Sequence, residues 1–318
     1  MSILTSQYVN SLQAGDVFRE WLIDILWGRI ENKECKVLVY KVNPASHTVC
    51  RFDFVGENYS IVAKFFSEPT GFQKSYDAKR AMENEFHALK KVGKIINVPK
   101  PIAIKKEFNC VLITEYHPGE PLTEFLLNEK DIYEKIASVS KILRKLHKNT
   151  LSGYDKEREF ASFHNVLNYL NLDYEAREKF NYLLRLWWES DLLEQKKGCI
   201  IHTDAIPPHY LFNNGRVCAL DFESSRKNAN YIHDLGILCA EIKHFFTLEK
   251  KNAKRAKPYI NHLLWCYSRN ENEFNEIATT LPFFMSLGLL RISRLTCWSH
   301  LYKKYLIYKA LKCLKAIK

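Results

Sequence analysis

Hydrophobic periodicity divides this chain of 318 residues into two parts with different secondary structure. In the first third, short apolar runs show the two-residue alternation that is typical of β-strands, and turn residues separate them. From about residue 123 onward, the 3.6-residue period of amphipathic helices dominates. The elements expected in the first part are strands at 35–42, 49–55, 59–66, 100–104 and 110–114 and one helix at 75–92.

This segregation of strands and helices predicts an α+β fold with two lobes, because each kind of element buries its apolar face against neighbours in its own layer. A turn with Pro118 and Gly119 marks the change from one part to the other. We expect a small β-rich N-lobe at 1–116, with an antiparallel sheet and one helix, and a larger, mostly α-helical C-lobe at 117–318. Any ligand is expected in the cleft between the lobes.

The composition indicates a folded protein without a membrane-spanning segment. Hydrophobic residues make up 47% of the chain, which is enough for a buried core. No segment reaches about 18 uncharged apolar residues, and the first residues lack the pattern of a secretory leader, so we expect a cytoplasmic protein. The nine cysteines include no C-x-x-C pair, which favours reduced, buried thiols over a zinc site or a disulfide framework.

The formal charge of +11 suits polyanionic partners, which include nucleotides, acidic metabolites, nucleic acid and anionic membranes. Part of the excess lies in the tail from Lys303 to Lys318. Residues with helical spacing in and just before this tail are Leu301, Tyr305, Tyr308, Leu311 and Leu314. Such a basic amphipathic helix can lie on a membrane or bind phosphate. The alternative, which we favour, is a solvated helix that packs on its own lobe.

Two carboxylates in the second part carry the strongest chemical signal. Asp204 follows the apolar segment 199–201 and precedes two prolines, so a rigid loop can present it to an acceptor hydroxyl. Asp221 ends a second apolar segment at 217–220, where it can hold a metal on nucleotide phosphates; a turn or N-cap aspartate is the alternative. Glu223 is either a further ligand of that metal or a surface acid. The pair of acids has the arrangement that phosphoryl transfer requires.

Lys64 lies inside the apolar strand 59–66, so its ammonium needs an anion if it is buried. One such anion is a nucleotide phosphate. Another is a carboxylate on the next helix, where Glu83 and Glu85 are both available and Glu85 has the better position on the apolar face. Taken alone, the lysine can equally be solvated at an edge of the sheet.

Together these motifs resemble the aminoglycoside phosphotransferase and choline kinase-like family of small-molecule kinases, which have a protein-kinase-like fold. The resemblance runs in order from about residue 35 to 240 and covers roughly two-thirds of the chain. Its parts are Ile61-Val-Ala-Lys64, the helix with Glu85, Val98-Pro-Lys-Pro-Ile-Ala103, the segment from Leu112 to Leu122, Leu146-His147, His202-x-Asp204, Leu220-Asp-Phe-Glu223 and His233-Asp-Leu235.

The resemblance implies a role for each of these residues. Lys64 would contact the α- and β-phosphates of ATP or GTP and pair with Glu85, and Asp204 would act as the catalytic base. Asp221, with His209 and Glu223, would bind the metal. His202 and Asp234 would support the catalytic loop, since an aspartate in that position accepts backbone hydrogen bonds. The hinge, whose backbone would receive the adenine, would consist of Thr114, Glu115, Tyr116 and His117.

Two positions depart from the family pattern. The segment 43–48, where the phosphate loop is expected, contains no glycine, which many members of the family also lack. His209 stands where a kinase has an asparagine metal ligand. Mg²⁺ prefers oxygen ligands, whereas imidazole suits softer ions, so Mn²⁺ is an alternative to Mg²⁺ here. Thr203, where the family has glycine, is a smaller change.

The leading hypothesis is an ATP- or GTP-dependent kinase that acts on a hydroxyl of a small metabolite. A pseudokinase that binds nucleotide without catalysis is the alternative, and His209 is the residue that favours it. A protein that binds nucleic acid or membranes through its basic faces is a third class, which we do not expect. The net charge favours a neutral or anionic, sugar-like acceptor over a polycationic aminoglycoside. Side chains that either line an acceptor pocket or pack in the helical core are Trp187, Trp188, Trp265 and Trp298.

Overall fold

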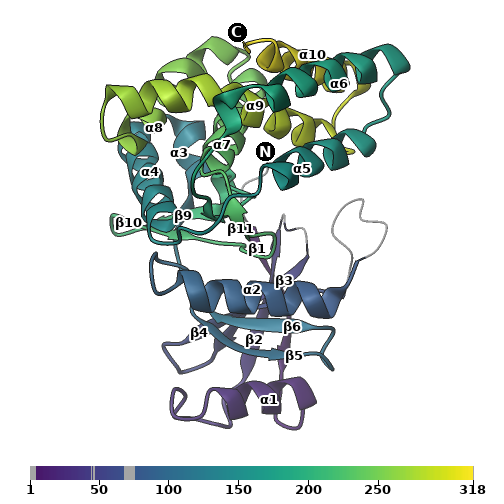
Figure 1. The fold of residues 1–318 in the computed structure, drawn as a ribbon. Coiled ribbons are helices and arrows are strands. Elements are labelled where there is room, and N and C mark those ends of the chain that lie inside the picture. The colour runs from purple at the N-terminus through teal and green to yellow at the C-terminus, as the bar shows by residue number, and fades with distance from the viewer. Residues whose placement is uncertain (1–4, 44, 46, 68–75, 318) are drawn as a thin grey trace. The chain divides into compact units, whose positions relative to one another are not determined.

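The computed structural model describes residues 5–43, 45, 47–67 and 76–317, and the chain separates into two compact units (Figure 1). Unit 1 comprises Met1–Glu120 together with Cys218–Ser224, and unit 2 comprises Pro121–Val217 and Ser225–Lys318. The boundary therefore lies four residues beyond the predicted one at 116/117. In addition, a short segment from the second half of the sequence belongs to unit 1, which a single boundary in the sequence does not describe.

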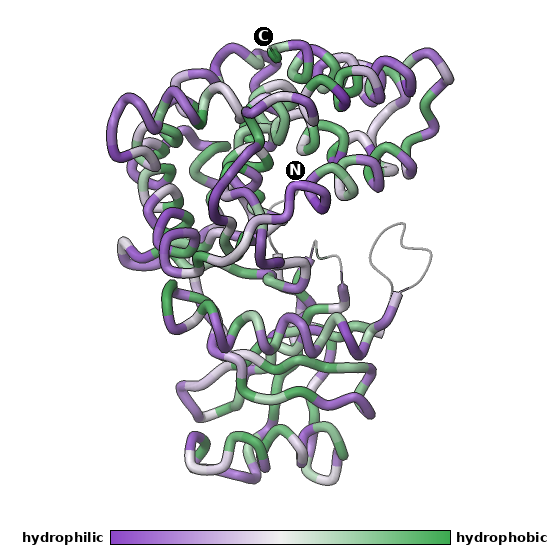
Figure 2. The backbone as a smooth tube through the Cα atoms, in the orientation of Figure 1, coloured by the Kyte–Doolittle hydropathy of each residue, from purple (hydrophilic) through white to green (hydrophobic). Residues whose placement is uncertain are grey.

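Unit 1 contains a six-stranded antiparallel sheet in the order β1-β2-β3-β4-β6-β5. Figure 2 shows hydrophobic and hydrophilic stretches next to each other in this unit, as expected for strands whose side chains point alternately to the two faces of a sheet. Five of the strands correspond to those predicted. Strand β1 was not predicted, because its polar sequence lacks an apolar alternation. The strands are β1 (Thr5–Leu12), β2 (Val37–Asn43), β3 (Thr48–Phe54), β4 (Ser60–Phe65), β5 (Pro101–Lys105) and β6 (Val111–Glu115).

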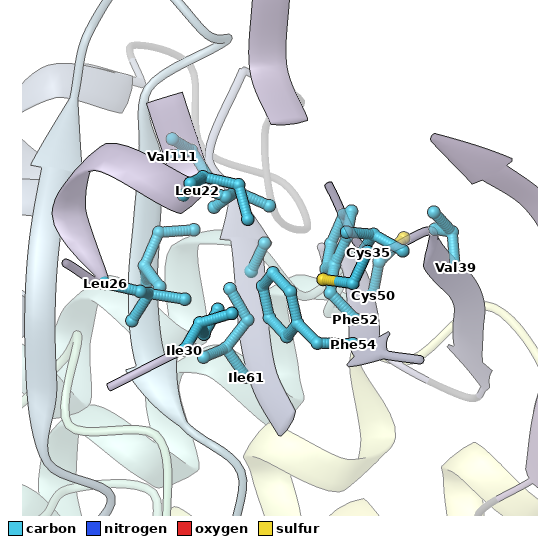
Figure 3. Packing of buried hydrophobic residues seen from close by; sticks show 14 residues of the cluster. Leu22, Leu26, Ile30, Cys35, Val39, Cys50, Phe52, Phe54, Ile61 and Val111 are labelled. Carbon is cyan, nitrogen blue, oxygen red and sulfur yellow. The ribbon is translucent and has the colours of Figure 1, made fainter. Parts of the chain in front are cut away.

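Helix α1 (Val17–Ile25), which the sequence did not predict, supplies the core on one face of this sheet. The Asp16 carboxylate caps it by accepting hydrogen bonds from the amides of Phe18 and Arg19. Leu22 and Leu26, both fully buried, pack in a cluster with residues of the sheet such as Phe52 (Figure 3). Each fully buried side chain of this size contributes roughly 1.5–3 kcal/mol to stability. The hydrophobic cluster therefore fixes one face of the sheet.

Helix α2 (Ala78–Val92) packs against β5 and β6 and is capped by Asp77. The predicted helix began at Ser75, which lies outside the described residues. The buried face of α2 carries Met82, Glu85 and Leu89. Because these positions are three or four residues apart, they share one side of the helix, and Glu85 is turned inward with the apolar residues.

Unit 2 is mostly helical, as the sequence predicts, and its core contains two long apolar helices, α7 and α9. They approach closely where each has a glycine: a β-carbon on Gly236 would lie 2.3 Å from the Phe284 Cβ, and one on Gly288 would lie 2.6 Å from the Ala240 Cβ. Only glycine fits this contact. The helices are α3 (Leu122–Asn128), α4 (Ile132–Lys148), α5 (Lys156–Asn168), α6 (Tyr174–Glu189), α7 (Ile232–Leu248), α8 (Ala256–Tyr267), α9 (Glu271–Ser293) and α10 (His300–Leu314).

The short strands of the second half differ from the predicted pair at 199–201 and 217–220. The first of these segments pairs with β11, not with the second. The hairpin between the two predicted acids instead joins β9 to β10 through Asn214 and Gly215, whose φ angles are 47° and 74°. This Asn-Gly pair is a common two-residue hairpin turn. The short strands are β7 (Glu120–Pro121), β8 (Cys199–Ile201), β9 (Tyr210–Asn213), β10 (Arg216–Ala219) and β11 (Arg226–Ala229).

The basic C-terminal helix α10 packs on unit 2, against α9 and α6. It buries Leu306, Ala310 and Leu314, whereas Leu301 and Tyr308 of the predicted apolar stripe are 80% and 60% exposed. Tyr305 and Leu311 are partly buried, so the residues with helical spacing coincide only in part with the packed face of the helix. The packing of α10 on its own unit agrees with the alternative that we favoured from the sequence. Lys318 lies outside the described residues. Among the described helices, none is long and apolar enough to cross a membrane.

The cysteines and tryptophans singled out in the sequence differ in how far they are buried. All nine cysteines are free thiols, and only Cys297 is exposed. Of the tryptophans, Trp187 is completely buried and packs on Phe283 with ring centroids 5.5 Å apart, while Trp188 and Trp265 are 42% and 58% exposed. Core packing therefore explains Trp187 but not the two exposed rings.

Candidate active site

Lys64 is the centre of an ionic cluster inside unit 1. It lies on β4, where Ile61 and Ala63 belong to the core packed on α1, and its own side chain meets α2 through Glu85. Its Nζ lies 2.8 Å from Glu85 Oε2, 2.9 Å from Asp221 Oδ1 and 3.0 Å from Glu223 Oε2. Only 12% of the lysine side chain is exposed. The structure thus brings four of the predicted site residues together.

The charges in this cluster do not balance, because one ammonium faces three carboxylates. Burial by itself lowers the pKa of Lys64, but the charges of Asp221, Glu85 and Glu223 outweigh it and hold the pKa well above its usual value. Burial raises the pKa of Glu85 to about 7, and the other two carboxylates add to this effect while Lys64 opposes it. The cluster therefore favours additional positive charge, from a proton or a cation.

Asp221 lies two residues after the end of β10, in the short segment that belongs to unit 1. Its backbone is left-handed, with φ at 61°. An aspartate tolerates this conformation better than most residues do. The segment is fixed on both sides of Asp221: the amide of Ala219 donates to the carbonyl of Asn97 at 3.0 Å, and the Phe222 ring is fully buried. Asp221 is thus aimed at Lys64 by its backbone, and it does not cap a helix.

His47 is a member of this cluster that the sequence did not identify. Its Nε2 lies 2.9 Å from Glu223 Oε2, and its ring packs on Phe66 with centroids 4.8 Å apart. His47 is 4% exposed, and its Nδ1 has no hydrogen-bond partner among the described residues. It belongs to the predicted phosphate-loop segment 43–48, of which Pro44 and Ser46 lie outside the described residues. No local pattern marks a histidine in a polar turn as a partner of an acid far along the chain.

The predicted hinge begins within β6, whose last two residues are Thr114 and Glu115. Thr114 is paired with Val62 in the sheet, and the Glu115 carboxylate accepts a hydrogen bond from Arg29 Nη1 at 2.8 Å. The amide of Glu115 donates to the Lys100 carbonyl and that of Tyr116 donates to the Ser60 carbonyl. The side chain of His117 contacts the carbonyl of Pro118 at 2.9 Å. Adenine binding by this segment remains a prediction. Because the amides of Glu115 and Tyr116 already donate hydrogen bonds within the protein, the base would have to bind other backbone groups of the segment.

In unit 2, the loop that carries Asp204 is held by Asp234. The Asp234 carboxylate accepts hydrogen bonds from the amides of His202 at 2.8 Å and Thr203 at 2.9 Å, and its Oδ2 lies 3.0 Å from His147 Nε2. Thr203 has a φ of 67°, so the loop adopts a conformation that is uncommon for a β-branched residue. Asp234 thereby fixes the backbone immediately before Asp204.

The same hydrogen bonds determine the charge state of Asp234. Burial alone would raise its pKa, but the hydrogen bond with His147 and the charges of His147, His202 and His233 lower the pKa to about 2. His147 Nδ1 lies 2.8 Å from the hydroxyl of Tyr267, so the imidazole is oriented from both nitrogens. Asp234 is therefore an anion throughout the physiological pH range, and its negative charge stabilises hydrogen bonds inside the protein.

Asp204 itself is 28% exposed at its side chain and has two basic neighbours in unit 2. Arg291 of α9 places Nη2 2.5 Å from Asp204 Oδ1, and its Nη1 donates to the carbonyl of Thr203. His209 Nδ1 lies 2.9 Å from the Asp204 carbonyl oxygen and 3.5 Å from its Oδ2. Sequence reasoning missed Arg291, because a single arginine near the end of an apolar helix carries no motif.

His209 ends a short 3₁₀ turn, Pro207–His209, whose first two residues are the two prolines. Its ring stacks on that of His202, with centroids 5.8 Å apart and an angle of 16° between the planes. If Nδ1 donates to the Asp204 carbonyl, the lone pair of the neutral imidazole lies on Nε2, which is the arrangement of many metal-binding histidines. The geometry of unit 2 is therefore compatible with His209 as a nitrogen ligand.

The acids of unit 1 fit a divalent cation. Glu85, Asp221 and Glu223 offer oxygen atoms that all lie within 4.8 Å of one another. Carboxylate oxygens are the ligands that Mg²⁺ and Ca²⁺ prefer. A cation would also compensate the surplus negative charge around Lys64. Both the donor set and the charge thus suit a hard cation at Asp221 and Glu223.

The antiparallel sheet of unit 1 and the helices of unit 2 define a protein-kinase-like fold, which solved kinases share. The ethanolamine kinase of Plasmodium vivax superposes with a TM-score of 0.64 at 13% identity, over 94% of this chain and 87% of that one. The choline kinase LicA of Streptococcus pneumoniae gives 0.54 at 14% identity, over 98% and 94%. An amicoumacin kinase in complex with AMP-PNP and Ca²⁺ gives 0.57 at 14% identity, over 87% of each chain.

A comparison of the sequence with protein-family models identifies the family. The model of the phosphotransferase enzyme family matches residues 45–255, which is more than half of the chain. No curated protein matches it in sequence. The chain belongs to this phosphotransferase family. Its fold is shared with choline, ethanolamine and aminoglycoside kinases.

Proposed function

We propose that this protein transfers the γ-phosphate of ATP or GTP to a hydroxyl group of a small neutral or anionic metabolite. The observation that carries the proposal is the cluster around Lys64, in which three carboxylates surround one ammonium. A cluster with surplus negative charge suits a metal-bound nucleotide, since the cation meets the acids and the phosphates meet the lysine. The net charge of +11 suits an acceptor that is not polycationic.

The proposed roles follow this division. Lys64, oriented by Glu85, contacts the nucleotide phosphates, and the hinge of Thr114, Glu115, Tyr116 and His117 receives the base. Asp221 and Glu223 hold the divalent cation, Mg²⁺ or Mn²⁺, and His209 is the candidate nitrogen ligand. When bound, the cation neutralises charge that develops on the transferring phosphoryl group.

Asp204 orients the acceptor and takes its proton. The hydroxyl oxygen forms the new bond to the γ-phosphorus, while the bond from that phosphorus to the β–γ bridging oxygen breaks and the nucleoside diphosphate leaves with the electron pair. The hydroxyl proton passes to the Asp204 carboxylate. Asp234 and His202 keep the loop in place, so the contribution of the protein is mainly positioning and charge stabilisation.

The test begins with a screen of a metabolite pool for phosphate transfer from labelled ATP or GTP. In Asp204→Asn, turnover should fall by about 10²–10⁴-fold, which is the usual contribution of a general base. Stabilisation of the variant by nucleotide and Mg²⁺ in thermal unfolding should persist. In Asp221→Ala, by contrast, metal-dependent nucleotide binding should be lost. Unchanged turnover in Asp204→Asn would remove this residue from the mechanism, and nucleotide binding without any transfer would support the pseudokinase alternative.

A further inference from the structure

The end of helix α9 presents two arginines beside the loop of Asp204. Arg291 lies in the last turn of the helix, and Arg294 is its C-terminal capping residue. Residues three positions apart on a helix have β-carbons about 5–6 Å apart, so the two side chains start from the same face. Arg291 is 30% exposed at its side chain and Asp204 28%, which leaves their ion pair accessible to a ligand.

The ion pair is at odds with the role proposed for Asp204. A carboxylate that accepts a hydrogen bond from a guanidinium at 2.5 Å is a weaker acceptor for the proton of a substrate. Arginine cannot relieve this by deprotonation. The pair is therefore best suited to catalysis if the guanidinium moves to another anion when the acceptor binds.

Arg294 indicates that an anion is expected here. Its Cζ lies 4.8 Å from the ring centroid of Tyr169, and its buried Nε has no hydrogen-bond partner among the described residues. Burial lowers the pKa of Arg294, and the charge of Arg291 lowers it further. Two neighbouring guanidiniums that repel each other gain from an oxyanion between them, because such an anion accepts hydrogen bonds from both.

A further acid close to Arg291, Glu241, adds little negative charge here. Glu241 of α7 interacts with both Asp204 and Arg291. Burial raises the pKa of Glu241 to about 8, with a further contribution from Asp204 and an opposing one from Arg291. Near neutral pH, Glu241 is therefore mostly protonated and does not neutralise Arg291, which pairs with Asp204.

We propose that Arg291 and Arg294 bind an oxyanion of the acceptor, so that the substrate is a small hydroxyl compound that also carries a carboxylate or a phosphate. This inference rests on the proposed function and narrows it to anionic acceptors. On binding, the oxyanion takes over the guanidinium of Arg291 from Asp204, and the Asp204 carboxylate then accepts the hydrogen bond of the hydroxyl. An anionic acceptor thereby frees the Asp204 carboxylate to accept the proton of its hydroxyl group. A neutral acceptor cannot displace Arg291 from Asp204 in this way.

The first experiment measures the discrimination between matched acceptors, with ADP release as the readout. Glycerol, glycerate and glycerol 3-phosphate form one series, and glucose, gluconate and glucose 6-phosphate form another, so that carboxylate and phosphate are compared with a neutral parent. We expect the wild type to prefer an anionic member by kcat/KM. Arg294→Gln, which leaves the contacts of Arg291 with the loop in place, should reduce this preference at least tenfold. A preference for the neutral members, or one that Arg294→Gln leaves intact, would overturn the proposal.

The second experiment measures binding without turnover. Inorganic phosphate and acetate are titrated by calorimetry into the protein saturated with ADP and Mg²⁺. We expect at least fivefold weaker binding of the preferred anion in Arg294→Gln and in Arg291→Gln, with partial recovery in Arg291→Lys. Arg185→Gln is the matched control, since this arginine of α6 is 64% exposed and 3.8 Å from Glu189.

The two experiments separate the inference from the function on which it rests. Loss of anion binding in Arg294→Gln together with no phosphate transfer to any acceptor would retain the anion site and reject the kinase. Transfer to neutral acceptors with equal anion binding in Arg294→Gln and Arg185→Gln would retain the kinase and reject the anion site.

Discussion

The two units each bury a cluster of charged side chains, and the clusters differ in how their charge is balanced. In unit 1, Lys64 faces three carboxylates within 3.0 Å. In unit 2, the single carboxylate of Asp234 accepts hydrogen bonds from the amides of His202 and Thr203 and lies 3.0 Å from His147. The first cluster has more negative charge than its lysine compensates, whereas the second has donors for both oxygens of its acid.

This difference supports the proposed binding of a ligand by the first cluster, whereas the second cluster maintains a backbone conformation. Unbalanced buried charge costs folding free energy, and a ligand that compensates it returns that free energy on binding. Hydrogen bonds to a buried carboxylate instead stabilise the fold without any ligand. The pKa values agree with this contrast, since the pKa of Glu85 is raised to about 7 and that of Asp234 is lowered to about 2.

The largest effect is expected for Asp234→Asn. The amide keeps the size of the side chain but removes its charge and turns an NH₂ group toward a backbone or imidazole donor. Removing one partner from a buried charged network typically costs about 3–5 kcal/mol. We expect a loss of this size in the free energy of unfolding, measured in urea by the helical signal at 222 nm, and Mg²⁺ should not restore it.

Asp173→Asn is the matched control. Asp173 is an exposed N-cap of α6 that accepts a hydrogen bond from the amide of Ala176 at 2.7 Å. Asparagine caps helices about as well as aspartate, so the control loses a charge in the same unit at little cost. Equal losses in the two variants would mean that the donors around Asp234 contribute nothing specific, and the contrast between the clusters would fail.

A smaller effect concerns Glu85, whose pKa is shifted in the opposite direction from that of Asp234. Its folded pKa of about 7 lies above the ordinary 4.5, so the folded protein retains a proton that the unfolded chain has released. The associated stabilisation is complete below about pH 4.5 and is lost as the pH rises through about 7, by roughly 3 kcal/mol in total. Glu85→Gln should abolish this decline, measured as the free energy of unfolding between pH 4.5 and 8.

Two comparisons sharpen this experiment. Glu83→Gln, on the same helix with a side chain that is 41% exposed, should leave the decline unchanged. Saturating Mg²⁺ should reduce it in the wild type, because the cation stabilises the ionised carboxylates that the proton otherwise compensates. A wild-type decline that Mg²⁺ does not alter would contradict a cation site at these acids.

Local periodicity accounts for the parts of the molecule that the sequence predicted. Five strands and the helix of unit 1 have strong apolar patterns, and the same patterns set the directions of Lys64 and Glu85. A lysine in an otherwise apolar strand and a glutamate on the apolar face of the next helix each require a buried partner. Their separation of 2.8 Å reflects a constraint that is visible residue by residue.

The features that the sequence did not predict depend on contacts between distant segments. His47 meets Glu223 across 176 positions and Arg291 meets Asp204 across 87, and neither basic residue has a local pattern that reveals its partner. Strand β1 is a polar edge strand without apolar alternation. The segment Cys218–Ser224 belongs to unit 1 although the chain on either side belongs to unit 2. Such placements follow from tertiary packing, which periodicity does not encode.

The smallest effect is expected for His209→Asn, which tests whether metal preference depends on the unit 2 loop as well as on the acids of unit 1. An asparagine can still donate to the Asp204 carbonyl, so the free energy of unfolding should change by less than about 1 kcal/mol. Its oxygen suits Mg²⁺ better than imidazole does, and the ratio of activity in Mg²⁺ to activity in Mn²⁺ should rise about 3–10-fold. Steady-state rates with each metal measure this ratio, and His300→Asn on the exposed start of α10 is the control. A fall in activity with both metals at an unchanged ratio would show that the histidine acts through its contact with Asp204, and the choice of cation would then rest with Asp221 and Glu223 alone.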